Sequence, residues 1–260
     1  MKKSNTAIFL FAHQDDESGC FYEIEKKISQ GSVVKIFYLT SGTPDGKLSS
    51  QRNLESLNVL SSLGVKKRNI IFLGLHAHSP DGKLAKNINS LLNTILKLFI
   101  NIQEIESFYF MAWEGGHQDH DATHLIGVTL AKKFNVIRKS YQFPLYTGIG
   151  LYLSFFRLFK VIKSNGPPIY TKIPWTKRFK YLKLLLKYPS QKRTWIGLFP
   201  FFIVHYFLYG TQILQPIIIS KNKYKNSPHN GVLLYERRGF YSYELFKKDT
   251  SIFIQQYIYS

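Results

Sequence analysis

Two short clusters of histidine and carboxylate side chains carry the chemistry that this sequence can perform. The first is Ala12-His13-Gln14-Asp15-Asp16-Glu17, and the second is Trp113-Glu114-Gly115-Gly116-His117-Gln118-Asp119-His120. Neutral imidazole and carboxylate are the usual protein ligands of a catalytic zinc ion, which keeps one coordination position for water. Each cluster follows an apolar segment that we predict to be a buried strand. The clusters therefore predict one metal-dependent site, provided that the two strands are neighbours in a sheet.

The spacing within the clusters suggests a role for each member. His13 and Asp16 lie three residues apart, so a turn opening into a helix lets both reach one ion, and His120 can supply a third ligand. Asp15 then lies beside the ion and can take a proton from its bound water, whose pKa a metal lowers to about 7. His117 is left to face a developing oxyanion or to protonate a leaving amine.

Other side chains around these clusters have more than one interpretation. We expect the Asp119 carboxylate to hold the His117 imidazole and raise its pKa. His124 follows His120 by one helical turn, but three ligands are already present. Two histidines and one carboxylate suit Zn²⁺, the expected ion, and also Fe²⁺. The competing interpretation makes the same residues turn-capping aspartates and ordinary surface histidines. The lone cysteine, Cys20, excludes a disulfide framework and any multi-cysteine metal site.

The elements that position the clusters alternate between strands and helices. Short apolar, β-branched segments predict strands at residues 7–12, 33–40, 70–73 and 108–112. Longer helical patterns lie at residues 17–30, 49–63 and 84–102, and from Asp119 or His120 to Phe134. This alternation indicates parallel βαβ units, so the predicted fold class is α/β and Rossmann-like, with a mostly parallel sheet and helices on both faces. The pattern then loosens, and we predict helices at 151–163 and 176–187 and a strand at 232–238.

Charge separates the two parts of the chain. Residues 1–150 carry 17 basic and 13 acidic side chains, a net of +4, whereas residues 151–260 carry 18 and 3, a net of +15. We therefore predict a catalytic domain at 1–140 and a smaller basic, aromatic-rich C-terminal lobe at 141–260 that completes the fold. Such a lobe suits an anionic surface. No recognised RNA-binding motif is present, so nucleic acid is not an expected partner.

Two segments of this lobe bear on membrane contact. Residues 195–220 carry no formal charge and are long enough to span a bilayer. Pro200, Gly210 and Pro216 interrupt them, so a buried helix, loop and strand is preferred over an interfacial segment or a span. Residues 177–187 mix lysine and leucine at helical spacing. An ordinary solvated helix and a helix lying on anionic lipid remain equally open there.

Both clusters, with the segments between them, resemble the PIG-L/LmbE-like family of metal-dependent N-acetylglucosaminyl deacetylases. The family signatures are A-H-P-D-D-E at a strand end and a later H-x-D-H. The resemblance covers roughly residues 6–135 and includes Leu39-Thr40-Ser41-Gly42, Arg52 with Glu55, Leu63-Gly64 and Pro80-Asp81-Gly82. Gln14 stands where the family usually has proline, but the ligands are intact.

The resemblance implies a Rossmann-like hydrolase that removes the N-acetyl group from an N-acetylglucosamine-type sugar and releases acetate. It supports His13, Asp16 and His120 as metal ligands and Asp15 as the general base. Likewise, it implies that His117 stabilises the oxyanion and protonates the amine. It also makes Arg52 a substrate-contacting residue. Asp81 is either a simple turn residue or an acceptor for a sugar hydroxyl.

Together these features predict a deacetylase of a lipid-linked or cell-surface glycan precursor, such as a lipopolysaccharide intermediate. We expect it in the cytoplasm, because the apolar segment after Lys2-Lys3 is too short for a signal peptide. The basic lobe would attach it peripherally to the inner face of the membrane. One alternative is a soluble deacetylase of a small N-acetylglucosaminide thiol precursor. Another is a non-catalytic module that binds membrane or nucleic acid. No oligomeric state follows from these residues.

Overall fold

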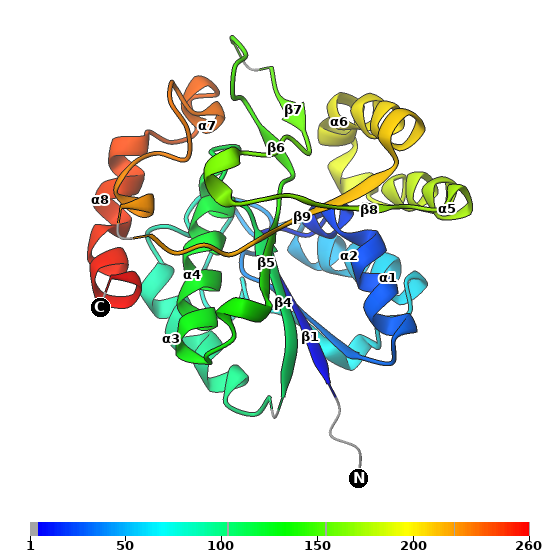
Figure 1. The fold of residues 1–260 in the computed structure, drawn as a ribbon, viewed down its shortest axis with the longest axis horizontal. Coiled ribbons are helices and arrows are strands. Elements are labelled where there is room, and N and C mark those ends of the chain that lie inside the picture. The colour runs from blue at the N-terminus through cyan, green and yellow to red at the C-terminus, as the bar shows by residue number, and fades with distance from the viewer. Residues whose placement is uncertain (1–4, 103, 154, 221, 260) are drawn as a thin grey trace.

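A mostly parallel sheet forms the centre of the protein (Figure 1). The structure is a computed structural model that describes residues 5–102, 104–153, 155–220 and 222–259. Seven strands of the described residues pair in the order β3-β2-β1-β4-β5-β9-β8. They are β3 (Ile70–Phe72), β2 (Val33–Tyr38), β1 (Thr6–Phe11), β4 (Ile105–Met111), β5 (Ser140–Phe143), β9 (Thr211–Pro216) and β8 (Ile169–Lys172). The five strands from β3 to β5 run parallel, whereas β9 and β8 pair antiparallel.

Helices cover both faces of this sheet because its strands are apolar on both sides. In β1, Ile8 and Leu10 belong to one core, and Phe9 and Phe11 belong to the other. Helices α3 (Ile88–Phe99), α4 (Gln118–Lys133) and α8 (Tyr243–Phe253) pack on the first face. Helices α1 (Phe21–Ser29), α2 (Ser49–Ser62), α5 (Trp175–Leu185) and α6 (Lys192–Val204) pack on the second. The predicted α/β fold class is therefore confirmed.

Two elements predicted after residue 139 are wrong. Residues 151–163 do not form a helix, because they belong to a hairpin of β6 (Tyr146–Thr147) and β7 (Arg157–Leu158) and the segment that follows it. Leu153 and Phe159 both adopt a left-handed backbone with φ of 54°, which a right-handed helix cannot include. Residues 232–238 hold a short helix, α7 (Leu234–Arg237), rather than a strand. Glu236 accepts the Leu233 N–H at its start.

The C-terminal part of the chain shares the sheet and both cores with the N-terminal part. Strands β9 and β8 extend the sheet beyond β5. Phe246 and Phe253 pack in one core, and Tyr181 and Phe202 pack in the other. Residues 141–260 therefore complete both hydrophobic cores.

The two segments considered for membrane contact are both folded. Residues 195–220 form most of α6, a π-helical turn (His205–Tyr209) and β9. No helix in the described part of the chain is long and apolar enough to cross a membrane. Helix α5 packs against α1, where Lys177 and Tyr181 contact the Glu25 carboxylate at 2.7 and 2.6 Å.

Candidate active site

The two clusters meet because β1 and β4 are adjacent parallel strands. Leu10 pairs with Phe110, so both strands end at the same edge of the sheet. The first cluster follows β1 and enters a 3₁₀ turn (Asp16–Gly19), and the second leads into α4. The carboxyl ends of parallel strands are where sites form in open α/β sheets. The two strands are therefore neighbours in the sheet, as the prediction of a single site required.

A strained turn presents Asp15 to the pocket. Its backbone is left-handed, with φ of 114°, which is unfavourable for any residue with a Cβ. The Glu17 carboxylate accepts the Asp15 N–H at 2.8 Å and the Tyr188 hydroxyl at 2.8 Å. Asp16 accepts the His13 N–H at 2.7 Å. These bonds hold the turn in place, and one of them comes from the C-terminal part of the chain.

His13, Asp16 and His120 form a buried group that could hold a metal ion. Asp16 Oδ1 lies 3.1 Å from His120 Nε2, and Asp16 Oδ2 lies 3.5 Å from His13 Nδ1. Among the described residues, His120 Nδ1 has no hydrogen-bond partner, and Nε2 contacts the Asp16 carboxylate without hydrogen-bond geometry. Buried polar atoms are normally satisfied, so imidazole nitrogens that lack a hydrogen bond beside a carboxylate fit a cation that the side chains would coordinate. The donor set suits Zn²⁺ or Fe²⁺.

Asp81 lies at the same centre, on the loop after β3. Its Oδ1 is 3.1 Å from His13 Nε2 and 3.9 Å from His117 Nε2. Burial alone would raise the pKa of the Asp81 carboxyl, but His13 and His117 outweigh burial and lower it. An ionised carboxylate therefore lines the pocket, where it can accept hydrogen bonds.

The Asp119 carboxylate does not hold the His117 ring, so this expectation is wrong. It accepts the N–H groups of Gly82 and Leu84 at 2.6 and 3.1 Å, and its Oδ2 lies 3.2 Å from His13 Nε2. Asp119 is fully buried at the start of α4, with the loop that carries Asp81 folded over it. It therefore fixes that loop and contacts a candidate ligand.

His117 is held by the backbone instead. The Asp119 N–H donates to His117 Nδ1 at 3.2 Å, so the proton of a neutral ring lies on Nε2. Burial, followed by the nearby His13, lowers the pKa of His117 to about 4 and outweighs the Asp119 charge, which raises that pKa as expected. His117 lines the pocket, where its Nε2–H can act as a hydrogen-bond donor.

Arg52 anchors the Asp15 turn from α2. Its guanidinium donates to the Gln14 carbonyl oxygen at 2.6 Å and to the Gly42 carbonyl oxygen, and lies 3.4 Å from Asp15 Oδ1. Burial raises the pKa of Asp15 to about 8, although Arg52 opposes this rise. Gln14, which replaces the usual proline, donates to Asn53 at 2.6 Å. Arg52 also lines the pocket, so its predicted contact with substrate is compatible with its position.

The pocket is a cavity of about 220 Å³ with a polar floor and a largely apolar wall. The wall includes Tyr146, Leu158, Trp195, Leu198, Arg238 and Phe240. Sequence reasoning missed these residues because no motif marks them. The available signal was Gly115-Gly116: a Cβ on Gly116 would lie 2.0 Å from the Tyr146 carbonyl oxygen, so glycine allows this close approach.

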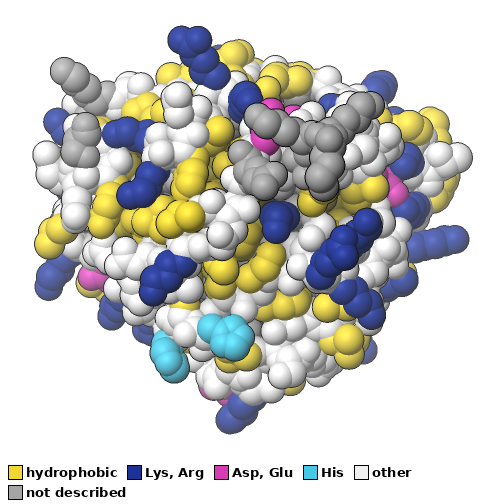
Figure 2. All heavy atoms as spheres, turned by 90° about the horizontal axis from the view of Figure 1, so that it is seen from below, with side chains coloured by type: hydrophobic (Ala, Val, Ile, Leu, Met, Phe, Trp, Pro, Cys, Tyr) yellow, Lys and Arg dark blue, Asp and Glu magenta, His cyan; other side chains and the backbone are white. Residues whose placement is uncertain are grey.

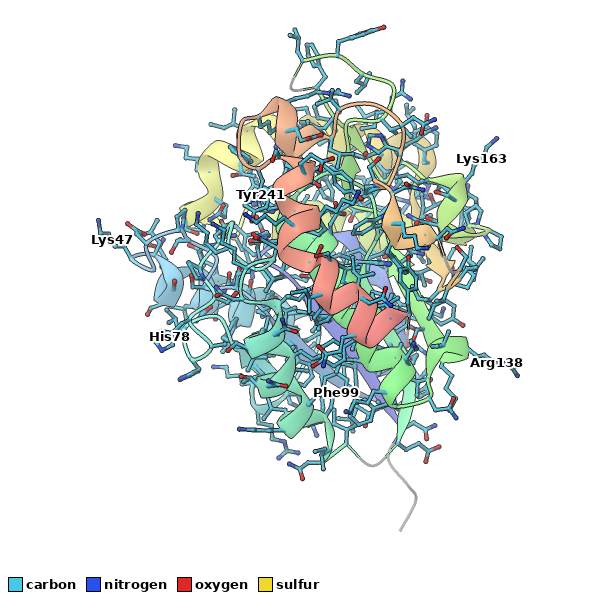
Figure 3. The ribbon with its side chains drawn as sticks, turned by 90° about the vertical axis from the view of Figure 1, so that its left-hand side faces the viewer. Lys47, His78, Phe99, Arg138, Lys163 and Tyr241 are labelled. Atoms are coloured by element: carbon cyan, nitrogen blue, oxygen red, sulfur yellow. The ribbon has the colours of Figure 1, made fainter. Side chains whose placement is uncertain are left out.

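His124, His76 and His78 lie outside the candidate metal centre. Both ring nitrogens of His124 are bonded, to the Met111 carbonyl oxygen at 2.9 Å and the Tyr224 hydroxyl at 3.0 Å. His124 is therefore a satisfied core residue. His76 and His78 are exposed, and His78 lies at the surface in Figure 3.

Comparisons with known proteins agree with this fold. The family model described as PIG-L, GlcNAc-PI de-N-acetylase, matches residues 8–131. Comparison with curated proteins gives no match. A triple mutant of a deacetylase from the teicoplanin biosynthetic pathway is similar, with a TM-score of 0.65 and 16% identity over 84% of this chain and 100% of that chain. The zinc-inhibited form of teicoplanin deacetylase gives a TM-score of 0.63 and 14% identity, with the same coverage.

An archaeal structure shares the same architecture. N,N'-diacetylchitobiose deacetylase from Pyrococcus horikoshii gives a TM-score of 0.53 and 17% identity, covering 88% of this chain and 89% of that chain. Fold and site together define a Rossmann-like α/β protein with a His/Asp cluster that could bind a metal ion. The family match over residues 8–131 confirms the resemblance seen in the motifs and supports an N-deacetylase of the hydrolase class.

Proposed function

We propose that this protein is a zinc-dependent deacetylase that removes the acetyl group from an N-acetylglucosamine-type sugar in a lipid-linked or cell-surface glycan precursor. The observation that carries the reaction class is the buried group His13, Asp16 and His120 at the floor of the pocket. Asp15 and His117 line the same pocket. The family match covers all five residues.

His13, Asp16 and His120 would hold the ion, with Zn²⁺ as the first choice and Fe²⁺ as the alternative. When bound, it supplies positive charge that polarises the acetamide carbonyl and lowers the pKa of water. Asp15 takes a proton from the attacking water. The Nε2–H of His117 donates to the carbonyl oxygen as that oxygen becomes negative. Asp81 and Arg52 border the space for the sugar.

The hydrogen bond at His117 also bears on which group protonates the leaving amine. Because the Asp119 N–H points at Nδ1, that nitrogen keeps its lone pair and the ring is neutral. A neutral ring serves better as an oxyanion donor than as an acid. Asp15 therefore returns the proton gained from water to the amine nitrogen as the C–N bond breaks. Acetate and the free amino sugar leave, and Asp15 is again ionised.

The lipid-linked substrate and peripheral attachment to an anionic membrane surface rest on the C-terminal part of the chain. That part has a net charge of +15. Its exposed apolar side chains include Tyr152, Leu153, Phe155, Ile196 and Leu208. Basic and apolar groups together favour an anionic lipid surface over water alone. A cytoplasmic location on the inner membrane face accords with this partner.

Acetate release with and without a chelator tests the proposal. The purified protein would be incubated separately with a membrane-lipid extract and with small N-acetylglucosaminides, and its metal content would be measured on the same sample. Chelator-sensitive acetate from the lipid extract alone is the expected result. Turnover of the small glycosides alone would favour a soluble deacetylase of a small thiol precursor. Absence of bound metal would contradict the proposed centre.

A further inference from the structure

An apolar groove lies beside the catalytic pocket and is not used by the proposed chemistry. Its volume is about 480 Å³, and Leu158 lines both spaces. The groove runs between the β6–β7 hairpin region and α6, with Phe159, Val161, Phe201 and Val204 among its walls. Phe201 remains 44% exposed. Large apolar side chains in an open concave site are typical of a ligand-binding surface.

A row of aromatic rings connects the candidate metal centre with this groove. The ring of His120 lies 5.2 Å from that of Tyr146, and Tyr146 lies 6.3 Å from Phe156. Phe156 in turn lies 4.8 Å from Phe201 on α6, measured between ring centroids. Phe156 and Phe201 line the groove and Leu158 lines both spaces, so a molecule whose sugar occupies the pocket can extend past Phe156 into the groove.

The side chain of Arg238 is half-buried between the catalytic pocket and this row of aromatic rings. The Arg238 guanidinium lies 5.7 Å from the centre of the Phe156 ring and lines the catalytic pocket. Among the described residues, no carboxylate forms an ion pair with it. Its neighbour Arg237, by contrast, donates to the carbonyl oxygens of Gly148 and Leu151 and so anchors the hairpin. Arg238 is available to bind an anion.

Further cations border the groove itself. Arg157 and Lys160 line it and are exposed. The sequence has no carboxylate between Asp121 and Glu236, so nothing in this stretch of chain neutralises them. An apolar surface with a cationic edge is complementary to a hydrocarbon chain that ends in an anionic group.

We propose that the groove binds the hydrocarbon chain of a lipid-linked substrate and that Arg238 binds the phosphate joining this chain to the sugar. This inference rests on the proposed deacetylase function, and it assigns three parts of one substrate to three parts of the structure. The acetylated sugar lies over the metal centre, the phosphate lies at Arg238, and the chain lies along Phe156 and Phe201.

Direct binding of two probes tests the groove without relying on catalysis. Decyl phosphate and neutral decyl glucoside would be titrated calorimetrically below their micelle concentrations. Phe201→Ser should weaken binding of both probes about tenfold or more, because the aromatic side chain no longer packs against the decyl chain of the probe. Ile196→Ser is the matched control, because Ile196 lies on the same helix, is 68% exposed and does not line the groove. If wild type binds neither probe, or Phe201→Ser binds both normally, the groove assignment is wrong.

A charge variant tests the phosphate position. Arg238→Gln should weaken decyl phosphate about tenfold, because a charge-assisted hydrogen bond is lost, and should leave decyl glucoside unchanged. Arg138→Gln removes the same charge from an exposed side chain (Figure 3) that does not line the groove, and should change neither. Equal effects of the two substitutions on decyl phosphate would show only a general charge effect and would overturn the assignment.

Turnover then separates failure of this inference from failure of the proposed function. N-acetylglucosaminyl phosphodiesters with alkyl chains of one and ten carbons would be compared. We expect kcat/KM to rise about tenfold or more with the longer chain in wild type and to lose that gain in Phe201→Ser. Deacetylation whose rate does not depend on chain length would contradict the groove assignment but not the proposed deacetylase function. Probe binding without any deacetylation would contradict the proposed function instead.

Discussion

The floor and the wall of the pocket are built in different ways. The floor comes from residues 13–17, 81 and 117–120, whose polar side chains are mostly buried and many of which contact one another. The wall consists of residues such as Tyr146, Trp195 and Phe240 and is mainly apolar and partly exposed. Loss of a floor contact leaves a buried charge or donor without its partner, whereas the wall can change its shape by repacking. The floor thus determines the reaction, and the wall is suited to select the substrate.

The largest expected effect comes from removing a ligand on the floor. His120→Ala should abolish both bound metal and acetate release, because only His13 and Asp16 would remain in the predicted ligand set. Metal content by mass spectrometry and chelator-sensitive acetate release measure the two losses. The exposed His78 replaced by alanine is the control. Retention of stoichiometric metal in His120→Ala would show that the floor does not hold the ion in this way.

Asp15→Asn should separate metal binding from turnover. The proposed base is lost while the ligands remain, so kcat should fall about 10²–10⁴-fold with metal content unchanged. Asp45→Asn, at an exposed position in the loop before α2, should keep the wild-type rate. A near-normal kcat for Asp15→Asn would rule out its role as the general base.

Asp119→Asn should affect the ion more than the reaction. Its carboxylate contacts His13 Nε2 and two backbone N–H groups. Partners of metal-binding histidines typically contribute about 10–100-fold in metal affinity. We expect a loss of that size in a metal titration, with kcat of the fully loaded enzyme nearly unchanged. A large fall in kcat at saturating metal would instead restore the sequence-based interpretation that Asp119 acts through His117.

The smallest expected effect lies at a hydrogen bond that joins the floor to the C-terminal part of the chain. Tyr188→Phe removes the hydroxyl that donates to Glu17, which should lower the free energy of unfolding by about 1 kcal/mol and loosen the Asp15 turn. Denaturant unfolding and kcat would be measured together. Tyr152→Phe removes a hydroxyl from a side chain that is 87% exposed and should change neither. Unchanged stability in Tyr188→Phe would mean that this hydrogen bond does not support the Asp15 turn.

The meeting of the two clusters could be predicted from the sequence because the information for it is local. His13 and His120 follow adjacent parallel strands, so strand order alone brings them together. The direction of the Asp119 carboxylate was not predictable, because its N–H partners lie on a loop 35 to 37 residues away. The helix predicted at 151–163 failed because left-handed residues and pairing of β6 with β7 outweigh local propensity.

Surface charge is distributed in a way that only the structure reveals. The sequence shows an excess of cations in residues 151–260. The face seen from the N-terminal side nevertheless carries many Lys and Arg side chains and few acidic ones (Figure 2). Arg238 at the pocket differs from these surface cations, because its side chain is half-buried against an aromatic ring.

The left-handed backbone of Asp15 makes the residue proposed for catalysis unfavourable for stability. With φ of 114°, the turn would suit glycine, and an aspartate there costs about 1–3 kcal/mol that the surrounding contacts must offset. A population of this protein selected for heat resistance alone would gain by replacing Asp15 with glycine. Such variants should be harder to unfold and unable to turn over substrate. In directed evolution, this turn is where a screen for stability and a screen for activity would first choose opposite residues.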